Sequence, residues 1–136
     1  MSIYKKKHNH FIEEAIKEAK KSLMNQKHGC VIVHNNTIIS RGYNYRIYKC
    51  QKTHIKYSVH AEESALSKLS FRNIKNYNMY VVRIHDNDLR ISLPCNKCMN
   101  LINNFKYIKN IFYSLEELNC CPVIDVEDTD CSDGSI

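Results

Sequence analysis

Apolar residues recur at every third or fourth position near the start of the chain, which is the spacing of one face of an α-helix. The pattern predicts an amphipathic helix over residues 8–24. Its apolar positions are Phe11, Ile12, Ala15, Ile16, Ala19, Leu23 and Met24. We expect this apolar face to pack against the rest of the domain.

Two further helices are predicted later in the chain. Ser58 is suited to be the N-cap of a helix over residues 59–69, and acidic residues follow in its first turns. Pro94 ends a polar stretch and opens a third helix over about residues 95–105, which carries apolar side chains for packing.

Short β-branched and apolar segments predict the strands. They cover residues 30–34, 37–40, 78–84, 110–114 and 122–126. The pair Asn35–Asn36 joins the first two strands as a hairpin turn, because asparagine tolerates positive φ. The apolar centre of 78–84 indicates burial on both faces. Pro122 places the last strand at an edge of the sheet.

The segments between these elements are expected to be irregular. Residues 45–57 are polar, aromatic and basic, and we interpret them as a loop. Residues 85–93 form a polar connection. Strands that alternate with helices imply parallel strand pairs and a sheet covered on both faces, which is an α/β fold.

Length and composition bound the class of protein. The chain has 136 residues, of which 43% are hydrophobic and 25% charged, so it suits one compact domain rather than a disordered chain or a coiled coil. We expect a single domain over residues 1–126 and an acidic, disordered tail over 127–136. The sequence shows neither a membrane span nor a secretory signal, so we expect a soluble, cytoplasmic protein.

The charges are unevenly distributed. All 20 basic residues and seven of the 14 acidic residues lie within residues 1–113, and the other seven acids follow. A basic body attracts phosphate-bearing ligands, from free nucleotides to polynucleotides. The alternative is a solvated surface whose excess charge the acidic tail partly neutralises. The lysines are scattered rather than aligned, so both interpretations stay open.

Seven cysteines in a chain without an export signal indicate a reducing compartment, in which some thiolates hold metal. Two motifs stand out: His60-Ala-Glu62, and Pro94 followed by Cys95-x-x-Cys98. Each is weak alone. A His-x-Glu at a helix start is usually a capping carboxylate beside a surface histidine. A Cys-x-x-Cys can be half a zinc ribbon, a redox pair or two core thiols.

Together the two motifs predict one metal site. A Cys-x-x-Cys spacing lets both sulfurs reach one ion from a single turn, and His60 supplies a third ligand from the neighbouring helix. Three protein ligands leave one position of tetrahedral zinc open, which is typical of a catalytic site. Zinc lowers the pKa of its bound water, and Glu62 lies near enough to exchange protons with that water.

His-x-Glu followed by Pro-Cys-x-x-Cys is the signature of zinc-dependent nucleobase deaminases. From about Gly29 to Ser114 the chain resembles the cytidine and deoxycytidylate deaminase superfamily. The resemblance includes the strand that starts at Gly29, the strand end Gly42-Tyr43-Asn44, both motifs, and the strand after the last helix.

The resemblance implies a zinc-dependent hydrolase. His60, Cys95 and Cys98 would hold Zn²⁺, and Glu62 would be the catalytic proton shuttle. A zinc-activated water would attack the amine-bearing carbon of the base, and ammonia would leave. The expected substrate is a cytosine nucleoside or nucleotide, and deoxycytidylate is the first candidate.

The resemblance also implies substrate contacts, a fold and an assembly. The backbone N–H of Ala61 would face the carbonyl oxygen of the base, the carbonyl of Leu93 would accept from the exocyclic amine, and Asn44 would touch the sugar or base. The implied fold is a three-layer α/β/α sandwich with a mixed five-stranded sheet. Members of this superfamily usually assemble, so a homo-oligomer is expected.

Alternative functions remain at this point. One alternative is a deaminase that acts on cytosine or adenine within RNA or single-stranded DNA, and another is a non-catalytic zinc module of the same fold. A redox role for Cys95 and Cys98 is a further alternative. Cys50 and His54 lie four residues apart, and a second zinc site there is conceivable.

Overall fold

The computed structural model describes residues 2–50, 55–69, 76–105, 108–114 and 123–125. In this part of the chain the helices are α1 (Ser2–Ala19), α2 (Ala61–Ser67) and α3 (Asn96–Phe105). The strands are β1 (Lys27–His34), β2 (Thr37–Tyr43), β3 (Tyr45–Cys50), β4 (Ile55–Val59), β5 (Tyr77–His85), β6 (Asp88–Arg90), β7 (Ile108–Tyr113) and β8 (Val123–Asp125).

The main sheet is mixed, as expected. Its strand order is β2-β1-β5-β7-β8, and β6 also pairs with β5. β5 and β7, which α3 connects, form the predicted parallel pair. The other pairs are antiparallel, and β8 lies at the edge, where Pro122 had placed it.

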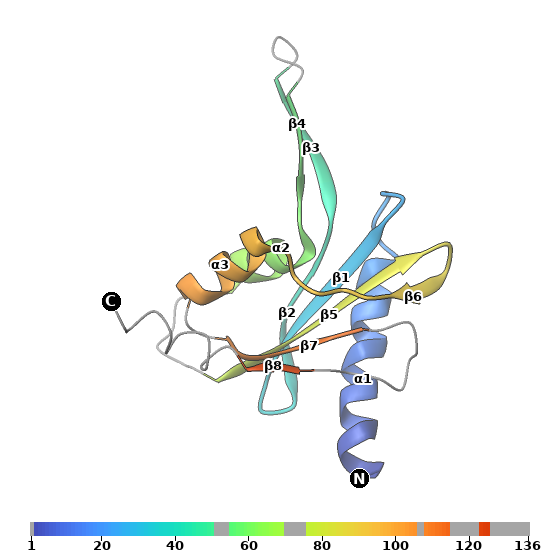
Figure 1. Cartoon of the computed structure of the whole chain (residues 1–136), viewed down its shortest axis with the longest axis vertical. Coiled ribbons are helices and arrows are strands. Elements are labelled where there is room, and N and C mark those ends of the chain that lie inside the picture. Colours follow the sequence, from blue (N-terminus) through green and yellow to red (C-terminus); the bar gives the residue numbers. More distant parts are fainter. Residues whose placement is uncertain (1, 51–54, 70–75, 106–107, 115–122, 126–136) are drawn as a thin grey trace.

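Helices cover both faces of this sheet (Figure 1), which confirms the three-layer α/β/α sandwich. The core under α1 consists of Phe11, Ile12, Ala15, Ala19, Val31, Val33, Tyr80, Val82, Ile84 and Phe112. The core under α2 and α3 consists of Cys30, Ile32, Ala61, Ala65, Leu66, Tyr77, Met79, Val81, Ile102, Ile108 and Ile111. Successive residues at the centres of β1 and β5 alternate between the two cores, and therefore the runs 30–33 and 79–82 are continuously apolar.

The first helix is displaced from its predicted bounds. It begins at Ser2 and ends at Ala19, instead of covering residues 8–24. The apolar stripe marks only the part of a helix that packs, so it could not locate the first turns. Leu23 fits the helical spacing but is 99% exposed, because the chain has already turned away at Lys20–Ser22.

Ser58 is not the N-cap of α2, which corrects the sequence prediction. The cap is His60, whose extended backbone (φ −77°, ψ 155°) ends β4, and it makes no side-chain capping hydrogen bond. Ser58 lies inside β4, opposite Arg46. The imidazole of His60 is therefore free to bind something other than its own helix.

The prediction of a loop over residues 45–57 is wrong. β3 and β4 form an antiparallel hairpin that extends away from the main sheet (Figure 1). These strands pair only with each other, so they have no core-facing alternation of apolar residues that a sequence pattern could show. The polar connection over residues 85–93 likewise contains a short strand, β6, which turns back at Asp86 and Asn87.

The turn between β1 and β2 confirms the asparagine hairpin. Asn35 and Asn36 both have positive φ, 49° and 64°.

None of the described helices has the length and apolarity needed to cross a membrane. The tail over residues 127–136, His54, and the last three cysteines lie outside the described residues.

Candidate functional site

The structure brings the two motifs together at one place. His60, Cys95 and Cys98 offer ligand atoms that all lie within 4.8 Å of one another. The Nδ1 atom of His60 is 3.7 Å from Sγ of Cys95 and 3.2 Å from Sγ of Cys98. In the part of the chain that the structure describes, this is the one group of three such side chains.

The starts of two helices position these side chains. His60 follows β4 directly, and its carbonyl accepts the first helical hydrogen bond of α2 from Ser64 at 2.9 Å. Cys95 does the same for α3, where its carbonyl accepts from Met99 at 2.8 Å. Cys98 follows three residues later in the first turn of α3 and is buried, and both sulfurs lie close to the imidazole of His60.

The donor set fits zinc. One imidazole nitrogen and two cysteine sulfurs are ligands that zinc prefers, and such atoms on one tetrahedral ion stand about 3.6 Å apart. Burial raises the pKa of the Cys98 thiol, and the carboxylate of Glu62 acts in the same direction. A bound cation would displace the thiol proton, because metal ions bind cysteine as the thiolate.

Glu62 is a buried carboxyl group beside these ligands. It is only 4% exposed and lies in the first turn of α2. Burial raises its pKa from 4.5 to about 7, a backbone hydrogen bond opposes the shift, and Glu63 adds to it. A carboxyl group with such a pKa can both take up and release a proton near neutral pH.

This geometry agrees with a match to a known family. The family model for the cytidine and deoxycytidylate deaminase zinc-binding region matches residues 5–115. The chain belongs to the cytidine and deoxycytidylate deaminase family. It is accordingly a zinc-dependent deaminase, and the zinc-binding region includes the cluster of His60, Cys95 and Cys98. No curated protein sequence matches the chain.

Solved deaminase structures share the fold. The chain is similar to dCMP deaminase from the cyanophage S-TIM5, with a TM-score of 0.60 and 21% identity over 82% of this chain and 85% of that one. Cytidine deaminase from Burkholderia pseudomallei gives a TM-score of 0.63 and 18% identity over 89% and 94%. RibD from Acinetobacter baumannii gives 0.57 and 19% over 82% of this chain and 29% of that one.

A small cleft of about 170 Å³ opens beside His60 in this deaminase. It is lined by Met24, Gln26, His28, Asn44, Ser58 and His60. Of these residues, only Asn44 and His60 were predicted from the sequence as site residues. Met24 and Gln26 lie in the connection between α1 and β1; the hydrophobic pattern marked Met24 only as an apolar helix position, and no pattern marked Gln26. The available signal for His28 was its position directly before the strand that starts at Gly29.

The electrostatics of the cleft are set partly by His28. Burial lowers the pKa of His28 from 6.5 to about 4, and the charges of Arg83 and His60 act in the same direction. His28 is therefore neutral near pH 7. A neutral imidazole can accept or donate a hydrogen bond towards a bound ligand without adding charge.

Asn44 is more constrained than the sequence could indicate. It is 6% exposed, and its side-chain oxygen accepts a hydrogen bond from the backbone N–H of His28 at 2.8 Å. Its amide nitrogen donates to the carbonyl of Gln26 at 2.7 Å and contacts the sulfur of Met24 at 3.3 Å. Asn44 thus lines the cleft and also holds the segment that forms its wall.

The remaining predicted contacts lie at the same helix starts. Ala61 is fully buried and is the first residue of α2, where a backbone N–H has no partner within its own helix. Leu93 is 55% exposed and stands two residues before Cys95. The side chain of Cys50 and the whole of His54 are outside the described part, so a second zinc site there stays a prediction.

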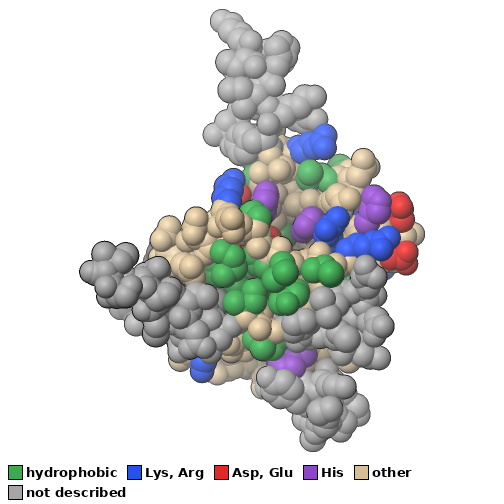
Figure 2. Space-filling view, in the orientation of Figure 1, with side chains coloured by type: hydrophobic (Ala, Val, Ile, Leu, Met, Phe, Trp, Pro, Cys, Tyr) green, Lys and Arg blue, Asp and Glu red, His purple; other side chains and the backbone are tan. Residues whose placement is uncertain are grey.

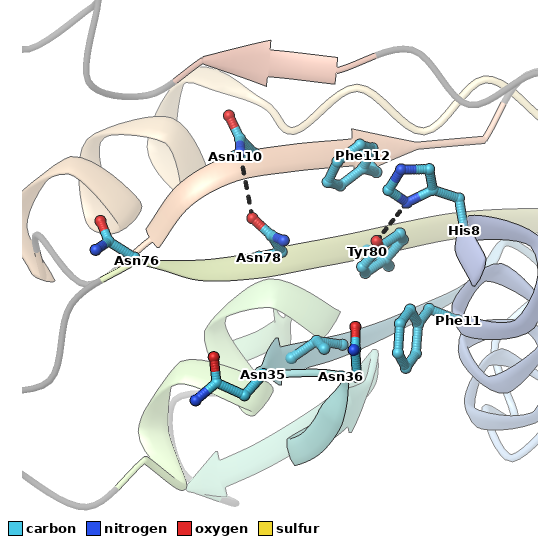
Figure 3. Close-up of a pocket in the computed structure, with 10 residues that line it drawn as sticks. His8, Phe11, Asn35, Asn36, Asn76, Asn78, Tyr80, Asn110 and Phe112 are labelled. Atoms are coloured by element: carbon cyan, nitrogen blue, oxygen red, sulfur yellow. Dashed lines mark hydrogen bonds between the residues drawn. The ribbon is translucent and has the colours of Figure 1, made fainter. Parts of the chain in front are cut away.

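A separate cavity of about 310 Å³ lies on the α1 side of the sheet (Figure 3). Asparagines and aromatic rings line it, and the amide of Asn110 donates to that of Asn78 at 3.3 Å. His8 is hydrogen-bonded to the hydroxyl of Tyr80 beside them. None of the predicted site residues lines this cavity.

Proposed function

We propose that this deaminase acts on the cytosine of a nucleoside or nucleotide, with deoxycytidylate as the first candidate. The observation that carries the proposal is the cluster of His60, Cys95 and Cys98 with the buried Glu62 two residues after His60, which also lines a cleft. The solved relatives support it, since one cyanophage S-TIM5 structure is of dCMP deaminase in complex with dCMP and dUMP.

Zinc, held by His60, Cys95 and Cys98, would supply a water whose pKa is lowered towards neutrality. Glu62 would take up the proton that this water loses, because it lies buried in the first turn of α2, two residues after the ligand His60. It would then deliver protons to the ring nitrogen and to the departing amine. The buried position of Glu62 keeps these transfers away from bulk water.

Backbone groups would orient the base. The N–H of Ala61, without a helical partner, would donate to the carbonyl oxygen of the base. The carbonyl of Leu93 would accept from the exocyclic amine. Asn44 would bound the sugar side of the cleft, and its hydrogen bonds to the segment containing Gln26 and His28 would keep the cleft open.

The experiment is ammonia release from the zinc-loaded protein with cytidine, deoxycytidine, CMP and dCMP. We expect turnover of dCMP above the others, and its loss in Glu62→Ala. Turnover of none of the four, with zinc bound, would contradict the proposal and favour a cytosine or adenine within a polynucleotide.

A polynucleotide substrate is the second candidate, and one observation favours it. The β3–β4 hairpin extends beyond the body of the domain next to the site, and basic and histidine side chains gather around its base (Figures 1 and 2). A strand bound there would release counterions, so binding would weaken steeply with salt. A KM that is insensitive to salt would exclude this candidate.

We further propose that the enzyme forms a homo-oligomer. Apolar side chains gather at the centre of the face shown in Figure 2, and Ile91, Leu93 and Val123 are each about half exposed. Exposed apolar clusters commonly mark protein interfaces. Sedimentation at micromolar concentration should give more than a monomer, and a monomer would contradict this proposal.

A further inference from the structure

A second, larger cavity adjoins the cleft beside His60. It has about 500 Å³ and is lined by Lys21, Leu23, Met24, Tyr43, Tyr45 and Arg46, and we refer to it as the Tyr–Arg cavity. Met24 also lines the small cleft, so the two cavities share a wall. Asn44, which lies between the two tyrosines in the chain, faces the cleft.

The two strands of the hairpin serve different cavities at their bases. Arg46 of β3 pairs directly with Ser58 of β4. Ser58 lines the small cleft, together with His60 two residues later, whereas Arg46 lines the Tyr–Arg cavity. The two cavities therefore lie next to each other at the base of one hairpin.

Hydrogen bonds fix the relative position of the two cavities. The hydroxyl of Ser22 donates to the backbone carbonyl of Asn44 at 2.8 Å, beside the side-chain bonds of Asn44 to Gln26 and His28. They join the segment after α1 to the junction of β2 and β3. These hydrogen bonds hold the two cavities at a fixed spacing, and a site held in this way has a lower cost of binding.

The charge of the Tyr–Arg cavity favours an anion. Arg46 is exposed and has no ion pair with any residue that the structure describes. Lys21 is already bonded to Glu18 at 2.9 Å, so Arg46 is the uncompensated cation. Among the residues that the structure describes, no acidic one lines this cavity. A guanidinium can bind a phosphate through two parallel hydrogen bonds.

The volumes of the two cavities also favour a ligand that occupies both of them. Pockets that enclose a whole small ligand are usually about 300–1,000 Å³ in volume. The cleft beside His60, with about 170 Å³, admits only part of a nucleotide. The remainder must lie outside it, and the adjoining Tyr–Arg cavity offers aromatic walls from Tyr43 and Tyr45 against which a sugar or base can pack.

Resting on the proposed function, we propose that the Tyr–Arg cavity binds the phosphate-bearing part of the substrate and that Arg46 neutralises the phosphate. Arg46 is then a specificity-determining residue, which makes the enzyme prefer a nucleotide to the corresponding nucleoside. The phosphate belongs either to a free nucleotide or to a short single strand, and the two sources share the same chemistry at this cavity.

The test compares kcat/KM for dCMP and deoxycytidine in the zinc-loaded wild type and Arg46→Gln. The matched control is Lys109→Gln, which also removes one exposed cation. Lys109 lies on β7 beside the start of β5, whereas Lys27, next to the cleft residues Gln26 and His28, pairs with the other end of β5. We expect the preference for dCMP over deoxycytidine to fall about tenfold in Arg46→Gln, as for the loss of a charged hydrogen bond. The control should shift this preference less than about twofold.

An unchanged preference in Arg46→Gln, or an equal fall in Lys109→Gln, would overturn the assignment. A trinucleotide with one cytosine is assayed in parallel to identify the source of the phosphate. If kcat/KM for dCMP depends on Arg46, the source is a free nucleotide; if kcat/KM for the trinucleotide does, the source is a single strand. If no substrate is turned over, the proposed function fails, and calorimetry decides separately on this cavity. Zinc-loaded Glu62→Gln should then bind dCMP about tenfold more tightly than Glu62→Gln with Arg46→Gln, and equal or absent binding overturns the inference.

Discussion

At the scale of single residues, the site depends on side chains that are held in place by hydrogen bonds within the protein. Asn44 is the clearest case, because its amide oxygen accepts from the N–H of His28 at the start of β1 and its amide nitrogen donates to the carbonyl of Gln26 just before β1. The main role of Asn44 is therefore to fix the shape of the cleft wall.

Replacing Asn44 by Ala should lower the free energy of unfolding by about 2 kcal/mol or more. The change leaves the N–H of His28 and the carbonyl of Gln26 without their partner, and each unsatisfied group costs about 1–3 kcal/mol. Urea denaturation of zinc-loaded protein measures the loss. Asn25→Ala, in the same segment but exposed, is the control. Equal stability of the two variants would show that Asn44 does not hold this wall.

The residues that we propose to carry the chemistry could be singled out from the sequence because their spacing is local. His60 and Glu62 lie two positions apart, and Cys95 and Cys98 three, so each pair is visible as a motif. His28 could not be predicted in this way. It reaches the cleft only because β1 starts there, and its lowered pKa arises from burial that no local pattern shows.

At the scale of elements, the close approach of α2 to β2 determines where His60 and Glu62 lie. A Cβ atom at Gly42 would stand 2.6 Å from the carbonyl oxygen of Ala61 and 2.6 Å from the backbone nitrogen of Ala65. Contacts this short force backbone to move, so only glycine allows the helix to lie at its observed distance.

Gly42→Ala should therefore destabilise the protein by about 1–3 kcal/mol, the usual cost of overpacking. It should also weaken zinc binding, because α2 would shift and carry His60 with it. Denaturant titration and competition with a zinc-binding dye measure both effects. Thr37→Ala, at an exposed position of the same strand, should change neither. Wild-type zinc affinity in Gly42→Ala would mean that this approach does not position the site.

The hydrophobic pattern predicted the elements that pack on the sheet. It did not predict the elements that lie outside the core. α3 and β5 appear within one or two residues of their predicted bounds, because their apolar faces contact a core. The β3–β4 hairpin has its own two-stranded sheet outside that core. Its polar and basic sequence is thus compatible with a strand but does not indicate one.

At the scale of the whole molecule, an ion-pair network fastens α1 to the outer strand β2. Arg41 binds Glu14 at 3.1 Å and Glu18 at 3.5 Å, and Lys17 and Lys21 bind the same carboxylates at 2.9 Å. The hydrogen bonds from Lys17 and Arg41 hold the pKa of Glu14 below its usual value of 4.5.

The stability that Glu14 contributes should depend on pH with a definite sign. Because its pKa is lower in the folded state, the contribution is present above about pH 4.5 and is lost as the pH falls through the folded-state pKa. Glu14→Gln should cost up to about 1 kcal/mol at pH 7, and the cost should shrink below pH 4.5. Denaturant unfolding across this range, with the exposed Glu13→Gln as control, measures it. A cost that stays constant or grows towards acid pH would contradict the assignment.

The overall architecture was predictable from the order of helices and strands together with the family signature. The order alone indicated parallel pairs and covered faces, and β5–β7 is such a pair. It could not indicate that β1 lies between β2 and β5, because strand order depends on contacts between segments far apart in the chain.

The central claim is that Glu62 and the three metal ligands act as one catalytic unit on a cytosine nucleotide. The most direct measurement is the rate of dCMP deamination by Glu62→Gln, with Glu63→Gln as the matched control and zinc content measured in both. We predict one zinc per chain in both variants, a kcat at least about 100-fold lower in Glu62→Gln, and a rate within about tenfold of wild type in Glu63→Gln. A zinc-loaded Glu62→Gln enzyme with wild-type kcat would contradict the account.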